Sequence, residues 1–450
     1  MKGKETRDLT VGSPFRLILG FAIPMLLGQL FQQFYNMVDT IIVGQCLGVA
    51  ALASVGSTGS INFMINGFCI GVSSGFAIPV AQRFGAGDYS GMRKFVATAA
   101  WLTAGFAAVM TVAVGLMCMQ ILEWMNTPAD IIQGAYDYIF VIFMGIPVTY
   151  LYNLLAGIIR SLGDSKTPVY FLLLSSALNI VLDFVTILGL GMGVNGPALA
   201  TVFSQGVSAL LCLFYMRKNY PILKMTEEEK KFHPGLAKVL CSMGIPMGLQ
   251  YSITAIGSVV LQTAVNSLGS LAVAAVTAGG KISLFFCSPF EALGGTMATF
   301  AGQNVGAKKM DRVKDGMICA CKIGFIYSAI ACVILIMLGD QIALLFMDAG
   351  EVEILARAHR FLICNSAFYF ALTLVNVVRF TIQGMGFSTF AILAGVCEMI
   401  ARSFWGFVLV PMLGFGPVCF GNPAAWVAAD LFLVPAFWHC YKKLKHQFEE

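Results

Sequence analysis

Charged residues are scarce in this chain. Asp, Glu, Lys and Arg make up 11% of its 450 residues, against roughly 25% in soluble domains. Hydrophobic residues make up 58%, and the mean hydropathy is +0.82. This composition excludes a large soluble core and predicts a polytopic α-helical membrane protein. A net charge of +5 is compatible with nucleic-acid binding, but the positions of the charges argue against it.

Several signatures of catalysis and metal binding are also missing. The chain has no GxxxxGK[ST] loop, so ATP-driven transport by this chain alone is not expected. The thirteen cysteines form no CxxC pair and lie mostly in apolar runs, which favours small buried hydrophobes over disulfides or metal ligands. Four dispersed histidines fit no metal-ligand spacing. We therefore expect neither an enzyme nor a cofactor.

Long apolar runs are abundant. At ~20 residues per span, they predict twelve transmembrane helices. The run after the first sixteen polar residues has no cleavage pattern, so we interpret it as a retained first span. The expected spans are 15–43, 51–79, 94–119, 131–156, 168–189, 194–216, 238–265, 272–300, 314–338, 354–380, 389–412 and 422–441.

One hydrophilic connector, which contains TEEEKKFHPG, divides the chain into equal halves. We expect an N-terminal six-helix bundle at 1–216, a linker at 217–236 and a C-terminal six-helix bundle at 237–450. Lys and Arg gather in the termini, the linker and alternate loops, whereas the loops between them lack both. The positive-inside rule then places both termini and the linker in the cytoplasm. The net charge is thus a topology signal, and no nucleic-acid partner is expected.

The two halves resemble each other in sequence. Residues 55–94 align without gaps on 276–315, so that VGSTGSINF lies over VTAGGKISL and Gln82 lies over Gln303. Six spans per half give both halves the same orientation, which predicts pseudo-symmetric parallel repeats with a cavity between them and alternating access by rocking. The alternative is that two Gly- and Ala-rich membrane segments are alike only in composition.

Ionisable residues inside the spans are functional-site candidates, because a charge there costs about 2.5–3.5 kcal/mol on insertion scales. Glu398 and Arg402 are four residues apart with the acid first, which favours a pair. Lys281 and Glu291 are opposite in sign. For these four, neutralised structural pairs and a functional role both stay open. The six residues that we place well inside the spans are Asp39 and Asp183 in the first half, and Lys281, Glu291, Glu398 and Arg402 in the second.

The two acids of the first half have no cation within its spans, so they must be protonated, bind a metal ion or meet a cationic ligand. Helix counting places Asp39, Asp183 and Thr201 about 7–12 Å below the outer boundary, and Asn179 lies one turn from Asp183. This hard-oxygen set suits H⁺ or Na⁺ and not soft transition metals. For Asn179 and Thr201 alone, ordinary interhelical hydrogen bonds are the alternative.

Other residues are candidates for a substrate cavity or for hinges. Tyr35, Tyr138 and Asn153 are within reach of the same pocket, and Gln250 in the seventh span is a further cavity candidate. Each of them alone is more often a packing residue. Pro24 and Pro246 remove a backbone hydrogen bond and should kink the first and seventh helices. Bending at Pro24 would move Asp39, although a static kink is equally compatible with the sequence.

These motifs together resemble the multidrug and toxic compound extrusion (MATE) family over essentially the whole chain. The resemblance rests on Ile23–Pro24, MVDTIIVGQCLGVAALASVG at 37–56, RSLGDSKTP at 160–168, LNIVLD at 178–183 and NGPALAT at 195–201. It implies a V-shaped pair of six-helix bundles and efflux of organic cations by H⁺ or Na⁺ antiport.

The resemblance also bears on the site. The family keeps an acid in its first helix, which matches Asp39, and the prokaryotic branch similar to DNA-damage-inducible transporters keeps positions that match Asp183, Asn179 and Thr201. Other branches carry acids in helices 7 and 10, where this chain has none. That departure favours ion coupling through the first bundle.

We therefore expect a monomeric secondary efflux transporter in a bacterial plasma membrane, in contact with lipids and exporting organic cations or amphipathic drugs. Neutralisation of Asp39 and Asp183 by the entering ion would expel the substrate. The alternatives are a flippase for lipid-linked precursors, which would favour a cationic cavity, and a non-transporting receptor or scaffold. The sequence selects neither the coupling ion nor the substrate.

Overall fold

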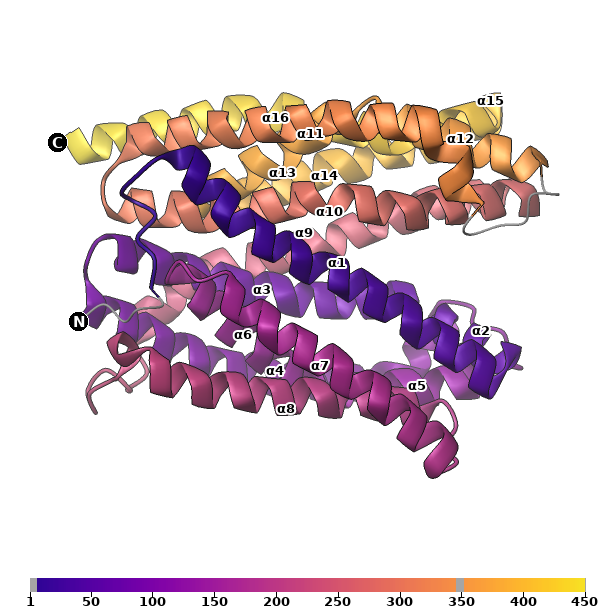
Figure 1. Ribbon diagram of the computed structural model, residues 1–450, viewed down its shortest axis with the longest axis horizontal. Coiled ribbons are helices and arrows are strands. Elements are labelled where there is room, and N and C mark those ends of the chain that lie inside the picture. The colour runs from indigo at the N-terminus through magenta and orange to yellow at the C-terminus, as the bar shows by residue number, and fades with distance from the viewer. Residues whose placement is uncertain (1–5, 345–351, 450) are drawn as a thin grey trace. The chain divides into compact units, whose positions relative to one another are not determined.

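The computed structural model describes residues 6–344 and 352–449, and within these ranges the regular structure is entirely helical (Figure 1). Two short π-helical turns and one 3-10 turn interrupt the α-helices. In chain order the elements are α1 (Pro14–Leu47), α2 (Val49–Ser57), α3 (Gly59–Gly85), α4 (Tyr89–Trp124), α5 (Ile132–Met144), α6 (Ile146–Ser161), α7 (Lys166–Phe184), η1 (Val185–Gly189), α8 (Asn195–Asn219), η2 (Pro221–Leu223), α9 (Pro234–Asn266), α10 (Ser270–Gly306), α11 (Met310–Ala343), α12 (Val352–Ser366), α13 (Tyr369–Gly384), α14 (Thr389–Phe404), η3 (Trp405–Leu409), α15 (Val410–Leu413) and α16 (Phe415–Glu449).

The length and composition of these helices confirm an all-α membrane protein. Ten helices in the described ranges are long and apolar enough to cross a membrane, and the number is twelve if each of two bent pairs is one span. The bends are 46° between α5 and α6 and 49° between α12 and α13. The prediction of one continuous helix over 51–79 is wrong, because the helix breaks at Thr58. There the side-chain hydroxyl donates to the Val55 carbonyl at 2.7 Å and competes with the helical ladder.

Backbone irregularities recur in the two halves, which confirms the repeat. The π-helical turn η1 begins at Val185 and its counterpart η3 begins at Trp405, 220 residues later. Composition alone would not place such a turn, or the two helix bends, at matching positions. Positive φ angles recur as well, 221 to 223 residues apart, in the pairs Gly48 and Gly269, Gly87 and Lys308, Gly163 and Gly386, and Gly191 and Gly414.

The chain folds into two compact units, and helices α1 and α9 are each divided between them. Of the described residues, one unit contains 6–8 together with Leu27–Gly248, and the other contains Leu9–Leu26 together with 249–344 and 352–449. This differs from the expected division into 1–216, 217–236 and 237–450. The first turns of α1 pack in the second unit, whereas the linker and the first half of α9 pack in the first. The V-shaped arrangement stays a prediction.

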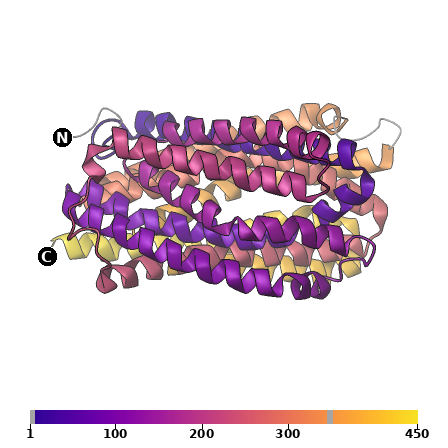
Figure 2. The same ribbon diagram turned by 90° about the horizontal axis from the view of Figure 1, so that it is seen from below.

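The first unit is built on close contact between small residues. A Cβ atom on Gly75 of α3 would lie 2.5 Å from Gly244 Cα, and one on Gly71 would lie 2.5 Å from the Met247 carbonyl oxygen. The first half of α9 therefore lies backbone to backbone against α3. In the same unit α3 also packs on α6, and α7 packs on α8. The turned view in Figure 2 shows the long helices running lengthwise.

In the second unit, α10 packs on α13 and α14 packs on α16. Residues 9–12, directly before α1, are fixed to this unit by polar contacts. The Leu9 amide donates to Gln303 Oε1 at 2.8 Å, and the Lys309 ammonium donates to the Thr10 carbonyl at 2.9 Å. Arg312 donates to the Gly12 carbonyl at 3.0 Å. The first turns of α1 thus enter the second unit from an anchored segment.

The hydrophilic linker is held against α4 by one buried carboxylate. Glu229 accepts hydrogen bonds from Arg93 Nε and Nη2, both at 2.8 Å, and from Ser90 Oγ at 2.8 Å. The Thr226 amide donates to the same carboxylate at 2.9 Å. The hydrogen bonds from Arg93 are the main reason that the pKa of Glu229 falls to about 2. The linker is therefore a docked segment of the first unit.

Gly87 gives a first test of the fold. A Cβ atom on Gly87 would meet nothing within 4 Å, so Gly87→Ala adds only the strain of a left-handed backbone. We expect a loss of about 1 kcal/mol. Gly105→Ala is the matched control, because Gly105 lies inside α4 with equally open space. There alanine should raise stability by roughly 0.5–1 kcal/mol. Thermal unfolding in detergent measures both, and a shift in the same direction for the two variants would contradict the structure.

Glu229→Gln tests the docked linker. Because the folded pKa of Glu229 lies below the unfolded value of about 4.3, its stabilisation is complete above that value and is lost as the pH falls toward about 2. At pH 7 the variant should lose on the order of 2 kcal/mol of local stability, and trypsin should cut faster after Lys230. The linker of the wild-type protein should be equally protected from trypsin at pH 8 and at pH 6. Glu228→Gln, at an exposed position next to Glu229, is the control, and equal cleavage of both variants would refute the docking.

Candidate functional site

Four helices of the first unit bring most of the predicted site residues together. Tyr35 and Asp39 lie one turn apart on α1, and Asn179 and Asp183 lie one turn apart on α7, so each pair shares a helix face. Thr201 on α8 contacts a residue of each face. Its hydroxyl lies 3.2 Å from the Tyr35 hydroxyl and accepts a hydrogen bond from Asn179 Nδ2 at 3.1 Å. The predicted grouping of Thr201 and Asn179 is therefore found in the structure.

The carboxyl groups of Asp39 and Asp183 face each other. They lie within hydrogen-bonding reach, but two ionised carboxylates have no donor, so this bond forms only when one of them holds a proton. Asp183 is fully buried and Asn179 is 1% exposed. Two like charges about 4 Å apart repel by about 4 kcal/mol at an effective dielectric constant near 20. The pair therefore needs a proton or a cation.

Further acceptors nearby also lack donors. Within the described part of the chain, no N–H or O–H group donates to Asp39 Oδ1, to either carboxylate oxygen of Asp183, or to Asn179 Oδ1. Buried acceptors are normally paired. Oxygen atoms without donors are the groups that hard cations bind. The arrangement can thus hold a proton shared between the acids or a small hard cation.

Two tyrosines lie beside the acids. Tyr138 on α5 is 7% exposed and interacts electrostatically with Asp39, Asp183 and Tyr35. Tyr35 in turn interacts with both acids. The structure therefore places these two cavity candidates at the acid pair.

The π-helical turn η1 begins two residues after Asp183 and was not foreseen from the sequence. Thr186 Oγ1 donates to the Asp183 carbonyl at 3.2 Å. The β-branched run of Val185, Thr186 and Ile187 disfavours a regular helix only slightly and gave no distinct signal. π-turns often occur at functional sites, because they shift side chains relative to the regular helix.

Two cavity candidates lie elsewhere. Asn153 donates to the Thr149 carbonyl of its own helix at 2.8 Å. Gln250 belongs to the second unit, where it accepts a hydrogen bond from Gln383 at 2.6 Å. Pro24 and Pro246 lie inside α1 and α9, each two residues before the helix passes to the other unit. Their roles as hinges stay predictions.

The charged residues of the second unit are only partly paired as expected. Glu398 and Arg402 do form an ion pair, at 3.3 Å. Lys281 and Glu291 do not, because both side chains are exposed and they lie ten residues apart along α10. A separation of about 15 Å on one helix prevents direct contact. Of the two interpretations that the sequence left open for these residues, a structural pair between them is therefore not found.

Two members of the charged cluster were missed as partners. Arg379 of α13 also pairs with Glu398, and Asp430 of α16 lies within electrostatic reach of both. Asp430 falls inside the expected span 422–441 and could have been found by the same search for charges. No pattern in the sequence indicates that Arg379 of α13 pairs with Glu398 of α14.

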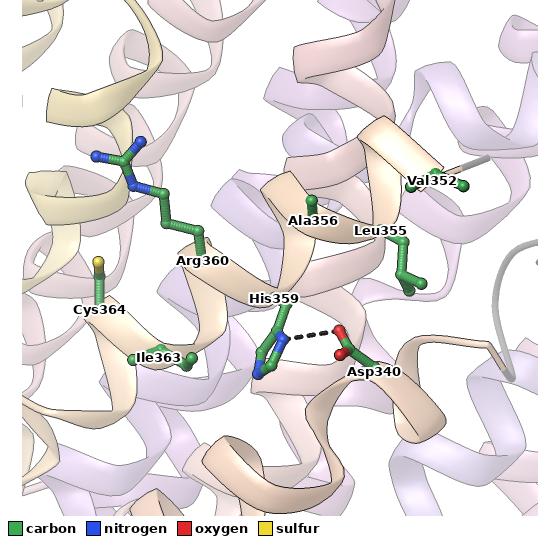
Figure 3. A pocket seen from close by; sticks show the side chains of 8 residues that line it. All are labelled: Asp340, Val352, Leu355, Ala356, His359, Arg360, Ile363 and Cys364. Atoms are coloured by element: carbon green, nitrogen blue, oxygen red, sulfur yellow. Dashed lines mark ion pairs between the residues drawn. The ribbon is translucent and has the colours of Figure 1, made fainter.

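A pocket of ≈ 450 Å³ opens between α11 and α12 of the second unit (Figure 3). In it the ring of His359 points toward Asp340, with Nδ1 2.7 Å from Oδ1, while Arg360 points away. Leu355 and Ile363 supply apolar walls. The pocket contains none of the predicted site residues, so its volume does not identify the functional site.

Comparison with known proteins gives the same fold. The MatE family model matches residues 24–185 and 246–416. The chain is 29% identical over 452 residues to the probable multidrug resistance protein YoeA of Bacillus subtilis, covering 97% of this chain and 96% of that protein. It is 23% identical to an FAD transporter of Shewanella oneidensis over 78% of each chain. The structure matches an outward-facing multidrug resistance MATE family transporter with a TM-score of 0.91 and 23% identity, covering 99% and 100% of the two chains.

Thr201→Val tests the hydrogen-bond junction. Valine keeps the shape of threonine but leaves Tyr35 and Asn179 without their shared partner, which should lower stability by about 1–2 kcal/mol. Thr201→Ser retains the hydroxyl and should recover most of that loss. The measurement is thermal unfolding of the solubilised protein. If serine and valine destabilise equally, the hydroxyl contributes nothing.

Proposed function

The chain belongs to the multidrug and toxic compound extrusion (MATE) family, whose members are transporters and not enzymes, and we propose that it exports organic cations or other amphipathic toxic compounds in exchange for H⁺ or Na⁺. Multidrug efflux is the activity that the family relationship supports. The coupling to an ion rests on one observation, the pair formed by half-buried Asp39 and fully buried Asp183. Asp39 Oδ1 and both carboxylate oxygens of Asp183 accept no hydrogen bond from any described residue.

The proposed exchange follows from competition at this pair. An ion that neutralises the carboxyls removes their attraction for a cationic substrate, and a bound substrate cation disfavours the ion. Antiport requires such mutual exclusion. A ligand shifts the equilibrium between two conformations of a transporter only if its affinity for the two conformations differs. Tyr35 and Tyr138 offer aromatic faces beside the charge, which suit organic cations. The same pair of acids thus serves both ligands in alternation.

The chemistry of the site is compatible with either coupling ion. A proton shared by two carboxyls satisfies the hydrogen bond between Asp39 and Asp183 directly. Na⁺ would instead take oxygens of both acids, the Asn179 amide and the Thr201 hydroxyl. An acidic site does not favour the flippase alternative, for which we expected a cationic cavity. We further propose a monomer in the bacterial plasma membrane with both termini and the linker in the cytoplasm.

The decisive experiment is efflux from proteoliposomes under separately imposed pH and Na⁺ gradients, with a fluorescent organic cation as substrate. Asp39→Asn keeps the size of the side chain but cannot ionise, so we expect gradient-driven efflux to fall at least tenfold. Asp137→Asn is the matched control: it removes a carboxyl of α5 whose neighbour is Gln133 on the same helix.

The gradient that drives wild-type efflux identifies the coupling ion. Full gradient-driven efflux by Asp39→Asn would show that the proposed mechanism is wrong. Equal losses in Asp39→Asn and Asp137→Asn would point to a general effect of removing charge and would also count against the acid pair.

A further inference from the structure

The second unit contains a buried ionic cluster that the proposed exchange at Asp39 and Asp183 does not use. Glu398 of α14 lies between Arg379 of α13 and Arg402 of the same helix. These three side chains are 3–6% exposed. Arg402 Nε also donates to Asn422 Oδ1 of α16 at 3.3 Å. One carboxylate therefore holds two guanidinium groups, and the trio carries one excess positive charge.

Asp430 is the fourth member, and one of its two carboxylate oxygens has no partner among the described residues. Its Oδ1 atom is buried and accepts no hydrogen bond from any described residue. Arg379 and Glu398 lie close enough to act on it electrostatically, yet among the described residues no ion pair joins Asp430 to Arg379. At the same time Arg379 Nε is buried and has no acceptor within the described ranges. An unpaired donor and an unpaired acceptor therefore lie in one cluster.

A purely structural network does not explain this arrangement. Buried polar networks that stabilise a fold are normally fully paired, since one unsatisfied group removes the benefit. A buried ion pair is also no more stabilising than well-packed apolar side chains. In the same region the Gln383 Nε2 group is bound to Gln250, whereas Gln383 Oε1 has no donor in the described chain. The unsatisfied groups indicate that the cluster has a second arrangement.

We propose that Asp430 is a proton-binding site of the second unit and that it competes with Glu398 for Arg379. When Asp430 is ionised, it attracts Arg379 and makes the cluster neutral. When Asp430 takes up a proton, it becomes a neutral donor, Arg379 pairs with Glu398 alone, and the cluster gains one positive charge. Each step moves one proton and changes one ion pair.

The surroundings of Asp430 support this exchange. The charged or titratable groups that act on it are Arg379 from α13, Glu398 from α14 and Cys321 from α11. Arg402 from α14 is held by Glu398 and Asn422. Helix α12 also packs on α16, but its Arg360 and Cys364 lie against the first turns of α16, near Gly416 and Cys419. The competition for Arg379 thus connects α13, α14 and α16.

The proposal does not depend on the acid pair of the first unit. Asp430 and its partners all belong to the second unit. Loss of ion coupling at Asp39 would leave the competition for Arg379 unchanged. The two sites can accordingly be tested in separate measurements.

The test is infrared spectroscopy of protein labelled with ¹³C-aspartate, titrated by pH in an Asp39→Asn/Asp183→Asn background. We expect one isotope-shifted C=O band of a protonated, buried aspartic acid that disappears as the pH rises and is absent after Asp430→Asn. The label separates this signal from Glu291 and Glu398. A band that persists unchanged after Asp430→Asn would overturn the assignment.

Glu398→Gln then tests the competition and keeps the proposal falsifiable if Asp430→Asn does not fold. Without the Glu398 charge, Arg379 is free to pair with Asp430, so the ionised aspartate is favoured. We expect the midpoint of the Asp430 band to move at least one pH unit lower, a tenfold change in proton affinity. An unchanged or higher midpoint would show that the two acids do not share Arg379. Lys281→Gln, on the exposed face of α10, is the control and should leave the midpoint in place.

Discussion

Hydrocarbon offers a backbone no hydrogen bonds, and this constraint governs the whole structure. Every described span is therefore helical, because a helix satisfies its own amides and carbonyls. Departures from regular helix include the break at Thr58, the π-turns at Val185 and Trp405, and the internal prolines Pro24 and Pro246. One π-turn begins two residues after Asp183, and these two prolines each lie two residues before their helix passes to the other unit. Irregular backbone is thus found next to the acid pair and where helices pass between the units.

The two units use buried charge in opposite ways. In the first, Asp39 and Asp183 are two acids with no cation among them, so the missing charge must come from outside the protein. In the second, Arg379, Arg402 and Glu398 supply both signs internally. A site that lacks a counter-charge needs a proton or a cation from outside, whereas the second site already contains both signs and, in our proposal, takes up or releases only the proton of Asp430. Duplication of one bundle thus gave two chemically distinct interiors on the same backbone.

Periodic and compositional signals predicted the spans, the repeat and the gathering of Asp39, Asp183, Asn179 and Thr201, because depth along a helix follows directly from residue number. Contacts between helices of the second unit could not be predicted in the same way. The pairing of Arg379 with Glu398 depends on how α13 and α14 are rotated, and a single sequence carries no record of that. Lys281 and Glu291 show the converse error, since opposite signs suggested a pair that helix geometry forbids. Asp430 was visible in the sequence and was overlooked.

The division of α1 and α9 between the units has a consequence for synthesis. The first turns of α1, up to Leu26, belong to the second unit, whose other residues follow Leu249 in the chain. The first half of α9 belongs to the first unit, whose other helices precede it in the chain. Neither half of the chain can therefore reach its final packing while it is alone in the bilayer. Insertion must run ahead of folding, and the apolar surfaces near Ile18 and Phe76 must stay in lipid meanwhile. The first turns of α1 therefore reach their neighbours only after the chain beyond Leu249 has been made.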